Sequence, residues 1–217
     1  MDLSEEYLVD CDGSHDDKHA DCGVFGGWPY LAYGFVINSG GVPTEADDPY
    51  CAGTGECYPC MQGPVSLCGP PPYYCDPNIT QACPSQPLHA SIASWKDVSQ
   101  DEEDIQSELL HTGPLSVLLD ATQLQYYKEG VWDGHASPSH PALGCSQTYL
   151  NHAVLMTGYG TASLITDSRS AGGSEDSVPY WSVKNSWGEQ WGEEGYFRIV
   201  RGEGTCGINT AVTTSFV

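Results

Sequence analysis

Basic residues are scarce in this sequence. Its 217 residues include 7 Lys and Arg against 29 Asp and Glu, which gives a formal net charge of -22 and an isoelectric point near 4.2. A surface of that charge repels a phosphate backbone, so we expect no binding to nucleic acid. Self-repulsion falls when carboxylates protonate, which weakly favours an acidic compartment.

Long apolar runs are also missing. No stretch approaches the roughly 18 residues that a membrane-spanning helix needs, so we expect no membrane span. Met1–Asp10 has neither a basic n-region nor an apolar stretch, so we expect neither a signal peptide nor a transit peptide there. Apolar residues make up 40% of the sequence, which is enough to bury a core in one large domain or two small ones.

Cysteine is abundant, and the ten cysteines are unevenly placed. Six of them fall in residues 51–87, a stretch rich in proline and glycine that also holds an Asn-Ile-Thr glycosylation pattern at Asn78. This combination favours disulfides formed on the secretory route. Zinc is the alternative, because Cys57 and Cys60 form a C-x-x-C pair, but a zinc ribbon needs a second such pair and the sequence has none.

Residues 1–50 carry the pattern of one helix. Pro29 can open it, and Leu31, Phe35 and Val36 fall on one face. Gly40–Gly41 supplies the stop, because glycine adopts a left-handed cap at little cost.

A second helix is predicted over residues 99–113. Ser99 and Glu102 have the spacing of a capping box, and Gly113–Pro114 ends the helix. Beyond it the sequence predicts a polar surface loop at Thr161–Val178. Four strands are expected, at Leu115–Leu119, Ala153–Tyr159, Tyr180–Lys184 and Tyr196–Val200.

Two segments of this β-rich part contain residues of catalytic types. Leu150–Gly160 reads Leu-Asn-His-Ala-Val-Leu-Met-Thr-Gly-Tyr-Gly, and Tyr180–Gly188 reads Tyr-Trp-Ser-Val-Lys-Asn-Ser-Trp-Gly. Taken alone, His152 before an apolar strand is typical of a hydrogen-bonded structural histidine, and Asn185 beside Ser186 is typical of a turn. By themselves these residues leave catalysis as the less favoured interpretation.

The order of the motifs resembles that of the papain and cathepsin family of cysteine proteases. Similar segments cover nearly everything outside residues 51–87 and 161–178. They are Leu3–Cys11, Cys22–Gly27, Gly113–Val117, Tyr127–Val131, Asn151–Val154, Gly158–Gly160, Val183–Gly188, Trp191–Tyr196 and Cys206–Ile208.

The resemblance implies an α+β, papain-like two-domain fold with the active site between the domains. Residues 1–95 would form an incomplete helical left domain with the cysteine-rich insertion, and residues 96–217 a β-barrel-like right domain. Without the family's central left-domain helix, the apolar face of Leu31, Phe35 and Val36 is expected to be exposed.

The family's chemistry is peptide-bond hydrolysis by a Cys-His-Asn thiol mechanism. By resemblance, His152 would form an ion pair with the cysteine thiolate and then protonate the leaving amine. Asn185 would orient the imidazole, and Trp187 would shield their hydrogen bond from water. The resemblance implies no metal or other cofactor, and the expected partners are peptide or protein substrates and protease inhibitors.

Substrate-binding residues follow from the same resemblance. Two glycines would present their backbone to an extended peptide, and further residues would contact the side chains before the cut. Ala211 is small and neutral, which favours an apolar substrate side chain. The residues implied are Gly26, Gly27, Trp28, Pro29, Asn151, Ala153 and Ala211.

The family's nucleophile belongs to a Gln…Cys-Gly-Ser-Cys-Trp motif, and Cys-Gly-Ser-Cys-Trp does not occur in this sequence. By resemblance, Cys22 matches the cysteine of the glycine-loop disulfide, whose partner belongs to the segment that carries the nucleophile, so Cys22 is expected to lack that partner here. The resemblance pairs Cys145 with Cys206, and Cys11 is expected to pair within the cysteine cluster. We therefore expect the C-terminal portion of an endopeptidase that lacks both the nucleophile and the oxyanion-hole glutamine, and is inactive by itself.

Two alternatives remain. The chain could be a non-catalytic homologue that binds peptides or protease partners, although a pure binder has no need of both His152 and Asn185. It could instead be a disulfide-rich extracellular interaction module centred on residues 51–83, which leaves the match across residues 113–210 unexplained. Family resemblance implies a lysosomal, vacuolar or extracellular location.

Overall fold

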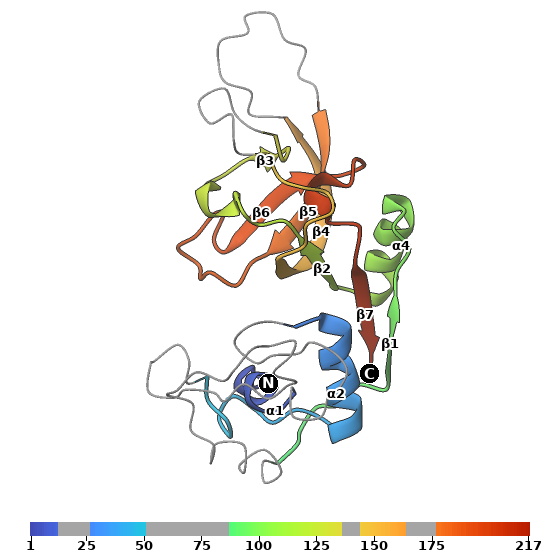
Figure 1. The fold of residues 1–217 in the computed structure, drawn as a ribbon, viewed down its shortest axis with the longest axis vertical. Coiled ribbons are helices and arrows are strands. Elements are labelled where there is room, and N and C mark those ends of the chain that lie inside the picture. Colours follow the sequence, from blue (N-terminus) through green and yellow to red (C-terminus); the bar gives the residue numbers. More distant parts are fainter. Residues whose placement is uncertain (13–26, 51–86, 136–143, 164–176) are drawn as a thin grey trace, which may run out of the picture. The chain divides into compact units, whose positions relative to one another are not determined.

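The computed structural model describes residues 1–12, 27–50, 87–135, 144–163 and 177–217. Cys22, Gly26, the cysteine cluster and Asn78 lie outside these ranges, so the predictions made for them stay predictions. The chain divides into two units, Met1–Lys96 with Ser215–Val217, and Asp97–Thr214. Helices α1 and α2 belong to the first unit, and most of the sheet belongs to the second (Figure 1).

The first unit is built on two helices, α1 (Glu6–Cys11) and α2 (Pro29–Ser39). The predicted helix is confirmed as α2, with Pro29 at its first turn and Gly40 at its end, where φ is 89°. Helix α1 was not predicted, because its few residues are too short for a periodic signal. The hydroxyl oxygen of Ser4 accepts the backbone N–H of Tyr7 at 3.0 Å, which satisfies one free donor of its first turn.

The small core of this unit contradicts one expectation. Phe35 and Val36 are buried, where exposure was predicted. They pack with Tyr7, Cys11 and Val42, and the rings of Tyr7 and Phe35 lie 5.5 Å apart. The prediction was wrong because it left out α1, which supplies an apolar partner for this face of α2.

One seven-stranded sheet, most of which belongs to the second unit, has the strand order β1-β7-β2-β4-β5-β6-β3. The neighbours β7 and β2, β2 and β4, β4 and β5, and β5 and β6 pair antiparallel, and β6 and β3 pair parallel. The strands are β1 (Ser94–Asp97), β2 (Leu115–Leu119), β3 (Val131–Trp132), β4 (His152–Ser163), β5 (Ser177–Lys184), β6 (Tyr196–Val200) and β7 (Val212–Phe216). Figure 1 shows β2, β4, β5 and β6 side by side.

The four predicted strands exist, and two of them are longer than expected. Strands β2 and β6 have the predicted bounds, whereas β4 and β5 continue toward each other into the segment predicted as a loop. Thr161 pairs with Pro179, and Ser163 with Ser177, so the loop prediction was wrong at both of its ends. A polar composition hid these residues, because the outer ends of a long antiparallel pair need no apolar side chains.

The predicted second helix is α4 (Glu102–Thr112), and its cap differs from the prediction. Asp101 is the N-cap, and its carboxylate accepts the backbone N–H of Glu103 at 2.8 Å. Glu102 does not complete a capping box with Ser99. Its carboxylate instead accepts the indole N–H of Trp181 at 2.6 Å and the backbone N–H groups of Gly202 and Gly204. This tertiary contact outweighs the local motif.

The main core lies between α4 and the sheet. Ile105 and Leu109 of α4 pack with buried residues of the central strands, among them Met156 and Trp181. Two short 3-10 helices, η5 (Leu124–Tyr126) and η6 (Thr205–Gly207), close the edges of this core. Within the residues that the structure describes, no helix is long and apolar enough to cross a membrane.

Candidate active site

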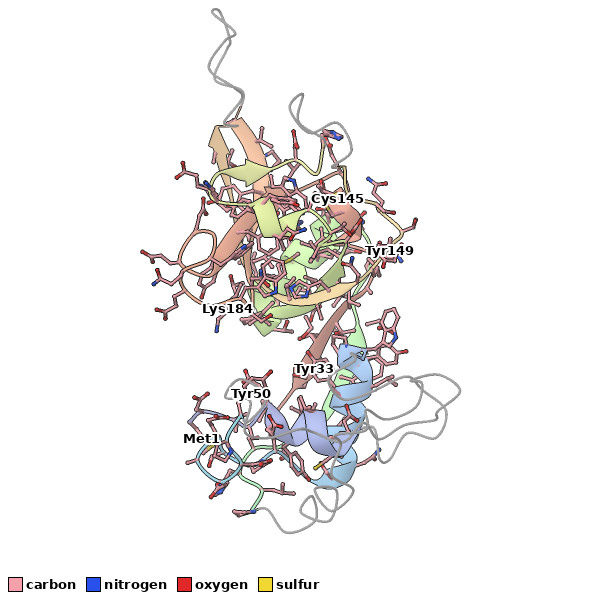
Figure 2. All side chains as sticks on the ribbon, turned by 60° about the vertical axis from the view of Figure 1, so that its left-hand side comes forward. Met1, Tyr33, Tyr50, Cys145, Tyr149 and Lys184 are labelled. Carbon is pink, nitrogen blue, oxygen red and sulfur yellow. A yellow bond between two sulfur atoms is a disulfide. The ribbon has the colours of Figure 1, made fainter. Side chains whose placement is uncertain are left out.

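His152 and Asn185 meet where β4 begins and β5 ends, at one end of two central strands of the sheet. His152 is the first residue of β4, and Asn185 directly follows the last residue of β5. Because β4 and β5 are antiparallel neighbours, the start of one lies beside the end of the other. Lys184, the last residue of β5, and Tyr149, which shortly precedes His152, are labelled in Figure 2.

A hydrogen bond of 2.8 Å joins Nε2 of His152 and Oδ1 of Asn185. Oδ1 also accepts the backbone N–H of Ser186 at 2.8 Å, which identifies this atom as the amide oxygen. An oxygen with no hydrogen can only accept, so Nε2 of His152 carries the proton. When the imidazole is neutral its lone pair is therefore on Nδ1, the nitrogen turned away from Asn185.

The oxygen of Asn185 determines how its side chain is oriented. The residue is buried, and its Nδ2 has no hydrogen-bond acceptor among the residues that the structure describes. Its backbone N–H donates to the carbonyl oxygen of Gly195 at 2.9 Å. The amide is thus fixed by one backbone contact and by the two bonds to its oxygen.

Trp187 covers the histidine. The two rings lie 5.2 Å apart with an interplanar angle of 31°, and 40% of Trp187 is exposed to solvent. The ring of Trp191 lies 5.0 Å from that of Trp187 and also contacts the rings of Tyr127 and Phe197. This ring contact is the arrangement that the predicted shielding role of Trp187 requires.

On the histidine side, the side chain of Asn151 bonds entirely to the loop after β2. Its Oδ1 accepts the backbone N–H of Ala121 at 2.8 Å, and its Nδ2 donates to Oδ1 of Asp120 and to Oγ1 of Thr122. Its backbone N–H donates to the carbonyl oxygen of Leu119 at 3.1 Å. We predicted Asn151 as a substrate-binding residue. Its side chain is committed to the protein itself, which leaves only its backbone carbonyl for that role.

On the asparagine side, Glu193 fixes the loop that follows β5. Its carboxylate binds the guanidinium of Arg198 through both oxygens, at 2.6 and 2.8 Å, and accepts the backbone N–H of Gly130 at 2.8 Å. The hydroxyl of Tyr127 donates to the carbonyl oxygen of Gly130. The same loop contains Gly195, whose carbonyl oxygen holds Asn185.

These contacts change acidities. Burial opposes ionisation of Glu193, but the hydrogen bonds and charge of Arg198, with the Gly130 N–H, prevail and lower the pKa of the carboxyl. Burial raises the pKa of Tyr127 to about 12. The hydrogen bonds that Arg198 donates to Glu193 raise the pKa of the guanidinium above its ordinary value. Near neutral pH the group therefore holds one anion, one cation and a neutral phenol.

A disulfide joins Cys145 to Cys206, the pair that the resemblance implied. Cys11 is disulfide-bonded as well, so none of the three cysteines within the described ranges is a free thiol. The carbonyl oxygen of Cys206 accepts the backbone N–H of Asp120 at 2.9 Å. The bridge therefore lies directly behind the loop that binds Asn151.

The other predicted substrate residues are divided between the two units. Ala153 pairs with Leu118 across β4 and β2, and the carbonyl oxygen of Ala211 accepts the backbone N–H of Leu118. These two alanines thus flank one residue of β2. Gly27, Trp28 and Pro29 belong to the first unit, where Trp28 is the N-cap residue of α2 and is partly exposed.

Sequence reasoning missed Asp120 and the Glu193–Arg198 pair. Asp120 had one signal, an acidic residue directly after the apolar run Leu115–Leu119. The ion pair had no such signal: Glu193 lies in a glycine-rich, charged segment typical of an exposed turn, and Arg198 is one charged residue inside the predicted strand Tyr196–Val200.

A histidine whose imidazole is oriented by an asparagine amide, at the end of a mixed sheet, is the arrangement of papain-like cysteine peptidases. Comparison with known proteins agrees. The family model described as papain family cysteine protease matches residues 1–216, and the chain belongs to that family.

Relatives from distant organisms match along the whole chain. Cathepsin F of Mus musculus is 34% identical over 217 residues, which cover 100% of this chain and 36% of that protein. Cysteine proteinase 1 of Dictyostelium discoideum is 32% identical over 219 residues, with 99% and 52% covered. This chain thus spans about half or less of the length of these relatives.

A solved structure, the digestive procathepsin L 3 of the Tenebrio molitor larval midgut, superposes with a TM-score of 0.65 at 31% identity. The match covers 100% of this chain and 56% of that one. The papain-like α+β fold expected from the sequence is confirmed.

Proposed function

We propose that the Asp97–Thr214 unit carries the histidine–asparagine half of a Cys-His-Asn peptidase site. The observation that carries this proposal is the hydrogen bond between Nε2 of His152 and Oδ1 of Asn185, which leaves the Nδ1 lone pair free to take a proton. A thiol facing Nδ1 would lose its proton to the imidazole and attack a peptide carbonyl. The imidazolium then returns the proton to the leaving amine.

The 217 residues do not complete this site by themselves. No Cys-Gly-Ser-Cys-Trp motif occurs in the sequence, and Cys145, the described cysteine nearest to His152 in sequence, is bound to Cys206. In the serine analogue, loss of the nucleophile costs on the order of 10⁶ in rate. We therefore propose that the isolated chain has no peptidase activity, and that catalysis needs a thiol supplied by a longer form of the protein.

Substrate preference follows from the alanines beside Leu118. Ala153 is exposed and Ala211 is partly buried, and neither carries charge or a polar side chain. A peptide side chain that lay against them would be favoured when apolar over basic. We propose a lysosomal, vacuolar or extracellular location for the protein, as membership of this family implies.

Two forms of the protein, compared in parallel, test the proposal: the 217-residue chain, and the longest reading frame that contains it. Each is treated with a vinyl-sulfone probe for cysteine proteases, mapped by mass spectrometry and assayed on a fluorogenic peptide. We expect labelling and turnover only in the longer form, with turnover abolished by His152→Ala. Specific labelling of the 217-residue chain at one cysteine would overturn the proposal.

Peptide binding without catalysis is the second candidate, favoured by the disulfide bonding of all three cysteines in the described ranges. Calorimetry with an extended apolar peptide separates the two candidates. A binder retains its affinity in the His152→Ala variant, and its longest reading frame shows no turnover.

A further inference from the structure

Asp120 forms hydrogen bonds to three separate segments of the second unit, and the catalytic proposal gives it no role. It follows β2 directly, and only 4% of it is exposed. Oδ1 accepts the backbone N–H and the hydroxyl of Thr122, at 3.0 and 2.5 Å, and Nδ2 of Asn151 at 3.3 Å. Oδ2 accepts the backbone N–H of Ser146 at 2.8 Å. Every contact donates to the carboxylate, so the site needs a group that only accepts.

Only an ionised aspartate meets that requirement. Burial opposes the charge, but the bonds from Thr122, Ser146 and Asn151 together outweigh it and lower the pKa of Asp120. An amide in its place would turn an N–H₂ group toward one of the four donors. The chemistry at this position is therefore specific, beyond the filling of space.

The contacts of Asp120 connect the Cys145–Cys206 disulfide to His152, the proposed catalytic base. On the disulfide side, the backbone N–H of Asp120 donates to the carbonyl oxygen of Cys206, and its carboxylate binds Ser146, which follows Cys145 in the chain. In front of it lies Asn151, whose whole amide is bound to residues 120–122. The next residue is His152, which pairs with Leu119 in the register of β2 and β4.

We propose that Asp120 is a positioning residue: through Asn151 it fixes the start of β4 so that the imidazole of His152 meets the amide oxygen of Asn185. This inference rests on the proposed function of that pair. Small displacements of a catalytic group are costly, because a shift of about 1 Å can reduce a rate by roughly 100-fold. A short, doubly held connection to a disulfide is a means of preventing such a shift.

The test reads the histidine itself and needs no peptidase activity. In the full 217-residue chain labelled with ¹⁵N-histidine, the proton on Nε2 of His152 gives a signal whose exchange with water reports opening of its bond to Asn185. The His152→Asn variant assigns the signal, and Asn185→Ala should remove its protection. Asp120→Ala should speed the exchange by about tenfold, since the bond to Asn151, one of the usual strength, is lost among the four that the carboxylate accepts.

Asp101→Ala is the matched control. It removes a carboxylate–backbone contact from the same unit, the exposed one at the N-cap of α4, and should lower stability without changing the His152 signal. If Asp120→Ala does not fold, Asn151→Ala tests the same connection and should have the same effect. In the double variant the two effects should not add.

Unchanged exchange in a folded Asp120→Ala or Asn151→Ala protein would overturn the inference and reduce Asp120 to a structural residue. Failure of the catalytic proposal has a different signature. The longest reading frame would then show no turnover, while the His152 signal would still respond to Asp120.

Discussion

Two carboxylates flank the His152–Asn185 pair, and they are held in different ways. Asp120, on the histidine side, is surrounded by neutral donors and backed by a disulfide. Glu193, on the asparagine side, forms a bidentate ion pair with Arg198 and binds the backbone of Gly130. One site can thus be positioned on one side by contacts anchored to a disulfide and on the other side by an ion pair. We expect different conditions to destabilise the Asp120 contacts and the Glu193 contacts.

The largest expected effect comes from opening the Cys145–Cys206 bridge, which closes a loop with a sequence separation of 61. The double substitution Cys145→Ser and Cys206→Ser should lower the free energy of unfolding by about 4 kcal/mol, because the unfolded chain gains the freedom of that loop. Urea unfolding followed by tryptophan fluorescence measures it. A loss below about 1 kcal/mol would show that the histidine side does not depend on its covalent anchor.

Glu193→Ala should cost the next most. It leaves the Arg198 guanidinium without its anion, and these side chains are only 29% and 27% exposed. Breaking a fully buried pair costs about 3–5 kcal/mol, so we expect about 2–3 kcal/mol for this half-buried one. Thermal unfolding measures the loss, and Glu189→Ala, an exposed carboxylate of the same loop, is the control. Equal effects of the two substitutions would contradict the role given to Glu193.

Asp120→Asn should be milder, because the amide keeps one oxygen for its donors. We expect a loss of about 1–2 kcal/mol, the cost of one unsatisfied buried donor. Salt distinguishes the two sides. The Glu193→Ala effect should shrink in 1 M NaCl, whereas the Asp120→Asn effect should not, because its partners are neutral. A salt effect on Asp120→Asn but not on Glu193→Ala would contradict the roles given to the two carboxylates.

Acid should weaken both sides. The pKa values of Asp120 and Glu193 lie below their ordinary values of 3.8 and 4.5. Groups with a lowered folded pKa contribute stability that is complete above the unfolded value and is lost as pH falls through the folded one. Melting temperature should therefore fall below about pH 4, with a smaller slope in Asp120→Asn. An identical slope in that variant would exclude Asp120 as a cause.

Of these two sets of contacts, alkaline pH should destabilise only those around Glu193, because they include Tyr127. Burial raises the pKa of this phenol from 10.0 to about 12, so its contribution is complete below pH 10 and is lost as pH rises through 12. Tyr127→Phe should remove that dependence. Stability curves at alkaline pH for the wild type and this variant give the measurement, and parallel curves would count against the assignment.

Much of the central sheet could be predicted from the sequence, because its strands are apolar runs bounded by polar or glycine-containing segments. Leu115–Leu119 and Tyr196–Val200 were predicted with their observed bounds. Thr161–Ser163 and the short α1 were not, since pairing across a long antiparallel ladder and packing onto α2 are tertiary effects. The capping box failed for the same reason, because the carboxylate of Glu102 binds residues about a hundred positions away.

The candidate site divides in the same way. His152 and Asn185 could be proposed because their motifs resemble those of a known family, and the structure brings the two side chains within 2.8 Å. The residues that hold them could not be proposed. Asp120 accepts the backbone N–H groups of Thr122 and Ser146, Glu193 accepts that of Gly130, and a backbone N–H leaves no trace in a sequence. Only the three-dimensional structure shows which acidic residues collect such donors.

The pairing of β4 with β5 has a consequence for how the protein opens. These strands lie in the middle of the sheet, with β2 and β6 on either side. Their ladder pairs Met156 with Val183 close to the strand ends that carry His152 and Asn185. Amide protons of central strands exchange by global unfolding, whereas those of edge strands exchange by local opening. Fraying of the two-residue strand β3 should therefore leave β4 and β5 paired, so that the backbone amides of these two strands exchange among the last of the residues that the structure describes.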